Sequence, residues 1–263
     1  MHREWEIVKW DGECCRQTTD RIVEEFPLTV VLDGWELATL LCSPDSLDNL
    51  VVGFLAAEGV IRSFDDLSSL KIDMATQTAS IQTRSGFDSG AAERILYKPT
   101  ITSGCAGGSA ANVRDIAGIP SVTGKTAIEA ERLIRLTAEF QKMALTFRAT
   151  GGTHAAALVI QDEIVAFFED IGRHNAVDKV LGNGLRRGLD LSGAIVLSSG
   201  RLSSEAVLKA ARMRIPILVS KSAPTVYAVE AAVRLGVTMV GFARGRRMNI
   251  YSLPQRIKCA PPA

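Results

Sequence analysis

The sequence has few cysteines and histidines, and neither residue type is spaced for a metal site or a disulfide framework. The five cysteines are an odd number without regular spacing, and no C-x-x-C pair occurs. The three histidines are too few and too scattered for zinc coordination. The chain also lacks a Walker sequence ending in Gly-Lys-Ser/Thr and the H-x-E with P-C-x-x-C pattern of zinc deaminases. These absences argue against a bound metal, a Walker-type nucleotide site and a disulfide-stapled domain.

A strong net charge and long apolar runs are also missing. Thirty basic against twenty-nine acidic residues give a net charge of +1, so no global field recruits nucleic acid or a membrane surface. No apolar run approaches the ~20 residues of a membrane span, and the first ten residues lack the apolar core of a signal peptide. We therefore expect a cytoplasmic protein without nucleic-acid or membrane partners. A hydrophobic fraction of 47% indicates a globular chain with one large domain or two modest ones.

The order of predicted elements divides the chain into a β-rich part and an alternating part. Strands are predicted at 5–10, 28–32, 35–41, 70–74 and 80–83, with a D-G hairpin turn at 33–34 and helices at 46–60 and 91–97. After a long helix at 126–145, strands at 155–160, 164–168, 194–197, 215–219, 238–242 and 248–252 enclose helices at 174–187, 203–214 and 225–235. This rhythm predicts an α/β sheet with helices on its faces. We expect a β-rich N-terminal domain at 1–122 and an α/β domain at 123–263.

The segment Glu169–Lys179, EDIGRHNAVDK, holds acid, guanidinium, imidazole, amide and ammonium groups within eleven residues. It stands between a strongly apolar strand and a helical pattern. A strand, a glycine turn and a helix together present a helix N-terminus to a ligand, usually an anion. We interpret the segment as a site, since loops on rigid scaffolds carry function. The alternative interpretation is a solvated turn.

Cys105 lies in the glycine-rich sequence ITSGCAGGS at 101–109. Glycine lets the backbone move freely and brings a thiol close to another molecule. The thiolate is the reactive form, and an exposed loop cysteine is a typical nucleophile. We interpret Cys105 as functional, against the alternative of a spare thiol in a turn.

The sequence FARGRR at 242–247 follows a predicted strand and carries three arginines. Guanidinium forks match phosphate and pyrophosphate oxygens, although a solvated basic turn is a common alternative. Loops at the carboxyl ends of successive strands meet at one edge of a sheet. We therefore expect the loops at 169–175, 198–204, 220–225 and 242–247 to lie together. His154 is by itself either a ligand, an acid–base group or a packing histidine.

Taken together, these runs resemble the FdhD family of sulfur-carrier proteins, which formate dehydrogenase needs for activity. The combination of EDIGRHNAVDK with FARG followed by N-x-Y is very specific. The resemblance covers most of the chain beyond residue 47. The matching segments are 50–61, 102–108, 147–158, 169–182, 199–205, 220–225 and 240–251.

The resemblance implies a function. Family members accept sulfur from a cysteine desulfurase as a cysteine persulfide. They pass it to the molybdenum or tungsten bis-molybdopterin guanine dinucleotide cofactor before that cofactor enters formate dehydrogenase. The persulfide cysteine corresponds to Cys105, which makes the protein a carrier-type sulfurtransferase. The resemblance also implies a homodimer and a C-terminal cytidine-deaminase-like three-layer α/β/α fold without zinc ligands.

The resemblance also implies where the cofactor binds. GDP or GMP should bind there as a fragment of the guanine dinucleotide. Asp170 is a candidate for the guanine N1–H and amino edge, because a carboxylate accepts both bonds. Arg173 and His174, with Lys179, are candidates for phosphate contacts or for tuning the thiolate. The segment matching the family's guanine-dinucleotide site consists of Phe242, Ala243, Arg244, Gly245, Arg246 and Arg247.

One departure from the family pattern concerns the cysteine loop. Many members carry C-x-x-C there, whereas this chain has Gly108 at the second position. A persulfide on Cys105 then has no neighbouring thiol, so either one cysteine suffices or this member has lost sulfur transfer. The flanking glycines and the remaining site favour the first. The alternatives are a chaperone that binds the cofactor without sulfur chemistry and a deaminase-like nucleotide hydrolase, which the missing zinc ligands disfavour.

Overall fold

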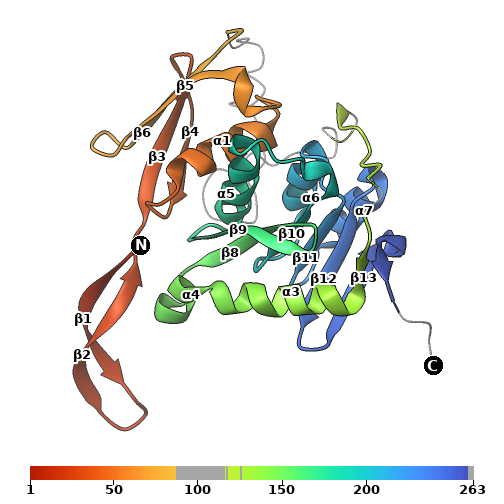
Figure 1. Ribbon diagram of the computed structural model, residues 1–263. Coiled ribbons are helices and arrows are strands. Elements are labelled where there is room, and N and C mark those ends of the chain that lie inside the picture. The colour runs from red at the N-terminus through yellow and green to blue at the C-terminus, as the bar shows by residue number, and fades with distance from the viewer. Residues whose placement is uncertain (87–115, 117, 125, 260–263) are drawn as a thin grey trace.

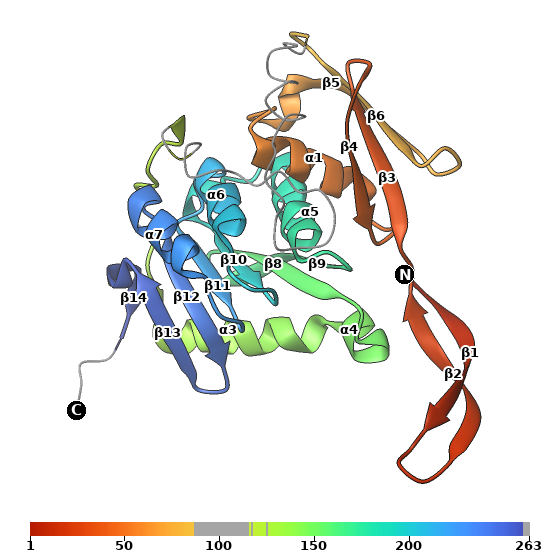
Figure 2. The same cartoon turned by 180° about the vertical axis from the view of Figure 1, so that it is seen from behind.

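The computed structural model describes residues 1–86, 116, 118–124 and 126–259. In this part the chain forms an α/β body, a smaller sheet beside it and a two-stranded arm, β1 (His2–Trp10) and β2 (Cys15–Val23), that extends away from both (Figures 1 and 2). The predicted helix at 91–97 and the Cys105 loop at 101–109 lie outside the described residues. No helix in the described ranges is long and apolar enough to cross a membrane.

The smaller sheet has four strands in the order β4-β3-β6-β5. β3 pairs antiparallel with β4 through a turn at Asp33 and Gly34, whose φ angles of 47° and 86° fit the predicted D-G hairpin. Helix α1 follows β4 and packs on the body. These elements are β3 (Phe26–Leu32), β4 (Trp35–Cys42), α1 (Leu47–Glu58), β5 (Leu67–Asp73) and β6 (Thr78–Thr83).

The α/β body is a six-stranded sheet in the order β13-β12-β11-β10-β8-β9. Strands β10, β11 and β12 are parallel, and the other pairs are antiparallel. The strands are β8 (His154–Ile160), β9 (Glu163–Asp170), β10 (Ile195–Ser198), β11 (Ile217–Ser220), β12 (Thr238–Arg244) and β13 (Arg247–Ser252). The helices are α3 (Ala130–Met143), α4 (Leu145–Thr150), α5 (Arg173–Arg186), α6 (Ser204–Arg212) and α7 (Val226–Leu235).

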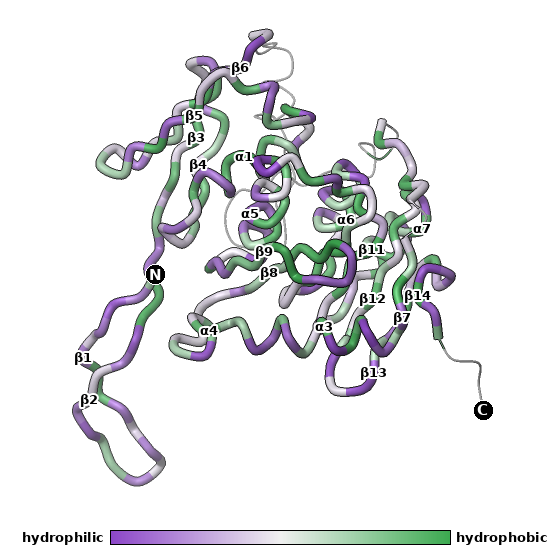
Figure 3. Tube along the Cα trace, viewed as in Figure 1, coloured by the Kyte–Doolittle hydropathy of each residue, from purple (hydrophilic) through white to green (hydrophobic). Residues whose placement is uncertain are grey.

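Helices cover both faces of this sheet. Helix α3 packs on one face, and α5, α6 and α7 pack on the other, so the body has three layers (Figures 1 and 2). Apolar residues gather along the covered strands, as the green stretches in Figure 3 show. The predicted α/β class and the alternating order are therefore confirmed, while the specific likeness to cytidine deaminases stays a prediction.

The predicted helix at 126–145 is wrong at both ends. Residues Ile128–Glu129 form a short strand, β7, which pairs in parallel with β14 (Ile257–Lys258). Ala144 leaves the helical region at φ −72° and ψ 73°, and α4 begins immediately after it. Amphipathic periodicity does not reveal such a break, because the apolar positions continue in phase across it.

Two glycines bring the N-terminal part and the body close together. Helices α1 and α5 cross so tightly that a Cβ on Gly53 would lie 1.8 Å from the carbonyl oxygen of Asp178. A Cβ on Gly182 would lie 1.9 Å from the carbonyl oxygen of Asn49. Only glycine fits both positions, so the two predicted domains share one packed junction.

The predicted domain boundary, between residues 122 and 123, falls in an extended segment along the body. The guanidinium of Arg256 donates to the carbonyl oxygens of Val122 and Gly124 at 3.1 and 3.0 Å. This segment is therefore fastened to the α/β sheet.

Candidate functional site

Five strand ends meet at one edge of the six-stranded sheet. The carboxyl ends of β9, β10, β11 and β12 lie there together with the first residue of β8. The loops after these strands touch in series. Ser220 Oγ donates to the carbonyl of Gly200 at 2.6 Å, and the amide of Phe242 donates to the carbonyl of Ser222 at 3.1 Å. The predicted meeting of the four loops is therefore confirmed, and we call this region the site edge.

Local sequence signals build the helices that follow two of these strands. Ser203 and Thr225 accept hydrogen bonds from the amides of Ala206 and Ala228 at 3.5 and 3.3 Å. Both residues are N-caps, which satisfy amides that a helix start leaves unpaired. The caps fix where α6 and α7 begin, and so how far each loop extends.

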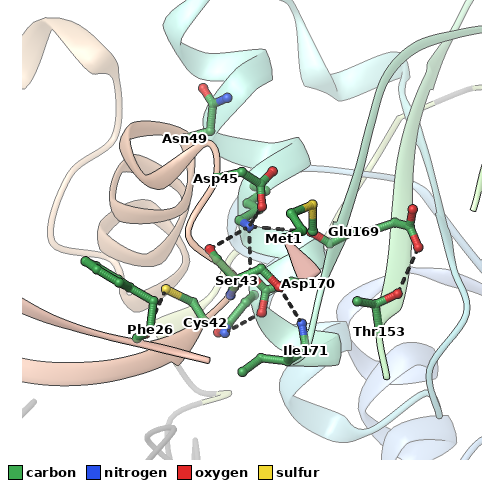
Figure 4. A network of polar contacts seen from close by, with 12 residues as sticks. Met1, Phe26, Cys42, Ser43, Asp45, Asn49, Thr153, Glu169, Asp170 and Ile171 are labelled. Atoms are coloured by element: carbon green, nitrogen blue, oxygen red, sulfur yellow. Dashed lines mark hydrogen bonds and ion pairs between the residues drawn. The ribbon is translucent and has the colours of Figure 1, made fainter. Parts of the chain in front are cut away.

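Asp170 is fully buried beneath the site edge (Figure 4). Its Oδ1 accepts from the Gly172 amide at 2.8 Å and from Asn175 Nδ2 at 2.9 Å. Its Oδ2 accepts from the Ser43 amide at 3.0 Å and lies 2.7 Å from Lys179 Nζ. A carboxylate has about four lone-pair positions, and here all are used. Within this structure the Asp170 carboxylate therefore organises the turn, while its contact to a guanine edge stays a prediction.

Lys179 is also fully buried, and its predicted contact to phosphate stays a prediction. Its ammonium lies 3.1 Å from Asp45 Oδ1 as well as next to Asp170, and it donates to the carbonyl of Ser43 at 3.4 Å. Asn175 extends this link, since its Nδ2 donates to the carbonyl of Leu41 at 2.8 Å. Buried charges of this kind need partners, and the partners come from β4 and the loop after it.

Glu169 holds the start of α4. Its carboxylate accepts from the amides of Thr146 and Phe147 at 2.8 and 2.7 Å. It also accepts from Thr153 Oγ1 at 2.8 Å, as Figure 4 shows. A carboxylate at a helix N-terminus satisfies free amides and complements the helix dipole. Glu169, the first residue of the predicted site segment, therefore caps the start of α4, a helix that precedes it in the sequence.

Arg173 and His174 begin α5, which has no side-chain cap and no acid in its first turn. A Cβ on Gly200 would lie 2.8 Å from Arg173 Cβ, so the missing side chain makes room for this arginine. The buried Nε of Arg173 has no hydrogen-bond partner in the described part of the chain. His174 Nδ1 lies 3.4 Å from Glu205 Oε1, and burial lowers the pKa of His174 to about 2, so this imidazole is neutral.

His154 joins this group at the first residue of β8. Its Nδ1 lies 3.3 Å from Ser199 Oγ, which also accepts from the Ala155 amide at 2.9 Å. Burial, and then the charges of Arg173 and Lys221, lower the pKa of His154. Each of these effects favours the uncharged form of the imidazole.

Lys221 belongs to the same cluster and was missed in the sequence. Its ammonium lies 5.1 Å from the centre of the Phe147 ring, in a cation–π contact. The signal was its position directly after β11, where loop residues of a parallel sheet meet ligands.

The turn at 242–247 lies at the far end of the site edge and is mostly exposed. Phe242 adopts φ 52° and Gly245 φ 61°, which places a two-residue turn between Arg244 and Arg247. The Arg244 guanidinium lies 5.8 Å from the Phe242 ring centre. Ala243 is buried in the core cluster under α3.

The arginines of this turn are open to solvent. Arg244, Arg246 and Arg247 make no ion pair with any described residue. Four strand spacings separate β12 from β9, which is about 19 Å. Lys221 follows β11, the strand next to β12, and Arg173 lies against Gly200 in the loop after β10, so both lie nearer to the turn than β9 does.

Clusters of metal-binding side chains are not found in the described ranges: no group of three or more His, Cys, Asp or Glu is placed to hold an ion. The predicted persulfide residue, Cys105, lies outside the described residues. The chemistry that the described site edge offers is therefore anion binding by arginine, lysine and free helix amides.

These features define a class: a three-layer α/β protein with a basic sheet edge and an attached β-domain. A comparison with known protein families shows which family the chain matches. The model of the FdhD/NarQ family matches residues 23–258. The chain is 40% identical over 253 residues to the sulfur carrier protein FdhD of Geobacillus kaustophilus, with 95% of each chain covered. It is 36% identical over 241 residues to that of Bacillus subtilis, with 91% of each covered. The chain therefore belongs to the FdhD/NarQ family.

A solved structure has the same fold. The crystal structure of a candidate formate dehydrogenase accessory protein of Desulfotalea psychrophila superposes with a TM-score of 0.78 at 22% identity. The match covers 98% of this chain and 99% of that chain, so the arm, the small sheet and the body correspond as a whole.

Proposed function

We propose that this protein is a sulfur carrier required for formate dehydrogenase activity. In this proposal Cys105 takes sulfur from a cysteine desulfurase as a persulfide. The protein then delivers the sulfur to the molybdenum or tungsten bis-molybdopterin guanine dinucleotide, which is bound as substrate. The observation that carries the proposal is the membership of the family through relatives that are named sulfur carrier protein FdhD.

The first chemical step is an exchange of one sulfur between two cysteines. The Cys105 thiolate attacks the outer sulfur of the donor persulfide, the donor S–S bond breaks, and the donor cysteine leaves as a thiolate. One thiol is enough for this step, because no electron is lost to an external acceptor. Gly108 in place of a second cysteine is therefore compatible with the chemistry.

The described site edge supports the binding of the dinucleotide substrate. Its phosphates would meet Arg244, Arg246 and Arg247 at one end and Arg173 at the other, because guanidinium groups bind phosphate oxygens in pairs. His174 and Phe242 lie beside these arginines. GDP or GMP should occupy part of this edge. Asp170 supports the edge from below through the turn at Gly172.

A complementation experiment separates the proposal from the chaperone alternative. A strain that lacks its own FdhD is given the wild-type chain, Cys105→Ala or Cys105→Ser, and formate dehydrogenase activity is measured in extracts. We expect activity with the wild type and none with either variant at equal protein levels. Full activity with Cys105→Ala would show that the protein binds the cofactor without carrying sulfur.

Several expectations from the resemblance remain predictions. These are the desulfurase as donor, the homodimer and the cytoplasmic location. The third alternative, a nucleotide hydrolase, predicts release of ammonia or phosphate from GMP or GDP. Prolonged incubation without product would remove it.

A further inference from the structure

Within the described residues, two solvent-accessible aromatic rings lie at the site edge, and each has a cation beside it. In the turn at 242–247, the Arg244 guanidinium lies 5.8 Å from the centre of the Phe242 ring. On the other side of the edge, the Lys221 ammonium lies 5.1 Å from the centre of the Phe147 ring, and Phe147 is 41% exposed. An aromatic face next to a cation suits a nucleotide, because the base stacks on the ring and the cation binds the phosphates.

The backbone of Phe147 is held in place, although its ring is exposed. The Phe147 amide donates to Glu169 at 2.7 Å, and its carbonyl accepts from the Gly151 amide at 2.7 Å. Glu169 is itself buried, and Thr153 donates to the same carboxylate at 2.8 Å. A single exposed apolar side chain is common in proteins and needs no role. Phe147 differs from that ordinary case, because its held position lies beside cations that no acid neutralises.

These cations are Lys221 and Arg173. Neither forms an ion pair with an acid of the described ranges, and the buried Nε of Arg173 has no hydrogen-bond partner there. After burial, the charges of Arg173 and Lys221 lower the pKa of His154, so both cations lie near the same imidazole. The Asp170 carboxylate is already held by Lys179, at 2.7 Å. An anionic ligand would therefore complete this group, because guanidinium and ammonium groups bind phosphate oxygens.

The two rings are too far apart to stack on the same base. Phe242 belongs to β12, whereas Glu169, which holds the Phe147 amide, belongs to β9. Four strand spacings separate these strands, which is about 19 Å. Stacked aromatic rings have centres only about 4.5–7 Å apart. The site edge is therefore long enough for two nucleotides, each with its own ring.

We propose that Phe147, Lys221 and Arg173 form a second nucleotide subsite, separate from the turn at 242–247. A purine base stacks on the Phe147 ring, and Arg173 binds the phosphates together with Lys221, whose flexible side chain turns from the ring to a phosphate oxygen. This inference rests on the proposed function, since the substrate proposed there carries two guanine nucleotide arms. One chain then holds both arms of one substrate molecule, one arm in each subsite.

Isothermal titration calorimetry of the full chain with GDP tests the proposal through the number of sites. We expect two GDP molecules per chain of the wild type. Phe147→Leu keeps an apolar side chain but removes the stacking surface, so the dissociation constant of one site should rise by roughly 5–150-fold. Lys221→Gln removes a phosphate contact without changing α4, and it should weaken the same site.

Two further variants make the test specific. Phe64→Leu is the matched control, because the Phe64 ring lies 5.9 Å from the guanidinium of Arg186, at the end of α5 that is far from the site edge. It should leave both GDP sites unchanged. Arg246→Gln should weaken the site at the turn and leave the Phe147 site as it is. Circular dichroism checks that each variant is folded.

A wild type that binds a single GDP would overturn the proposal. So would two sites that keep their affinity in both Phe147→Leu and Lys221→Gln, or a site that is weakened by Phe64→Leu. Failure of the proposed function has a different signature, because sulfur loading of Cys105 is measured by mass and needs no GDP. A chain that gains no sulfur but binds two GDP molecules, one of them through Phe147, would contradict sulfur transfer and support the second subsite.

Discussion

The segment 169–179 and the turn 242–247 lie at the same edge of one sheet, yet they use their charged side chains in opposite ways. In the segment, Asp170 and Lys179 are fully buried and paired with each other. In the turn, Arg246 and its neighbours are exposed and contact no described acid. A dense group of polar residues in a sequence thus indicates a buried network of hydrogen bonds and ion pairs as readily as a ligand site. The exposed, unpaired charges are the ones that remain for a ligand.

Loss of one partner of the buried pair should have the largest effect. Lys179→Met leaves the Asp170 carboxylate buried without its ammonium, which should lower the free energy of unfolding by about 3–5 kcal/mol. Urea unfolding followed by circular dichroism measures this loss. Arg246→Met is the matched control and should change stability by less than about 0.5 kcal/mol. Equal effects of the two changes would remove the contrast between the two regions.

The turn should respond in ligand affinity and not in stability. Arg246→Gln removes one charge-assisted contact to phosphate, which is worth about 1.5–3 kcal/mol, or roughly 10–150-fold in the dissociation constant. Isothermal titration calorimetry with GDP measures the change against the wild type. Lys258→Gln removes an exposed charge outside the site edge and serves as the control. If Arg246→Gln binds GDP like the wild type, the turn is a solvated loop.

A substitution at Glu169 tests the same buried network of hydrogen bonds and ion pairs, with a smaller expected loss of stability. Glu169→Gln keeps the shape of the side chain but removes the charge that the amides of Thr146 and Phe147 bind. We expect a loss of about 1–2 kcal/mol and faster hydrogen exchange at these two amides. Exchange that speeds up evenly across the whole protein would instead indicate a general loss of stability.

The smallest expected effect is a dependence on pH from His174. Burial lowers the pKa of His174 to about 2, whereas its unfolded value is near 6.5. Below pH 6.5 the unfolded state therefore binds a proton that the folded state does not, so stability falls as the pH falls. Between pH 7 and 5.5 this loss should be about 1.2 kcal/mol.

His174→Gln should remove this part of the pH dependence. His2→Gln changes an exposed histidine of the arm and should leave the dependence as it is. Unfolding free energies at the two pH values provide the comparison. An unchanged pH dependence in His174→Gln would show that the pKa of His174 is the same in the folded and the unfolded protein.

Much of the fold could be predicted from short-range patterns. The D-G hairpin at residues 33–34, the caps at Ser203 and Thr225, and the alternation of strands and helices all depend on residues close together in the chain. The break between α3 and α4 was missed, because no residue at 144 interrupts the apolar pattern. The second arm strand, β2, was missed because its exposed polar residues do not alternate with apolar ones.

The sequence predicted the location of the candidate site but not the contacts of its side chains. Strand ends identified the loops that meet, but not which charges would remain free. Asp170 contacts Ser43, which precedes it by 127 residues, and Lys179, which follows it on the next helix. The contact between His154 and Ser199 joins residues that are 45 apart in the sequence. Such pairings follow from strand order, which the sequence patterns do not specify.

We propose that Cys105 carries sulfur, while the exposed arginines at 242–247 bind the substrate and the buried contacts at 169–179 hold the site edge in place. Intact-protein mass spectrometry after incubation with a cysteine desulfurase and cysteine tests it most directly. We expect a gain of about 32 Da in the wild type that disappears in Cys105→Ala and is removed by a reductant. A wild type that gains no mass beside an active desulfurase would contradict it.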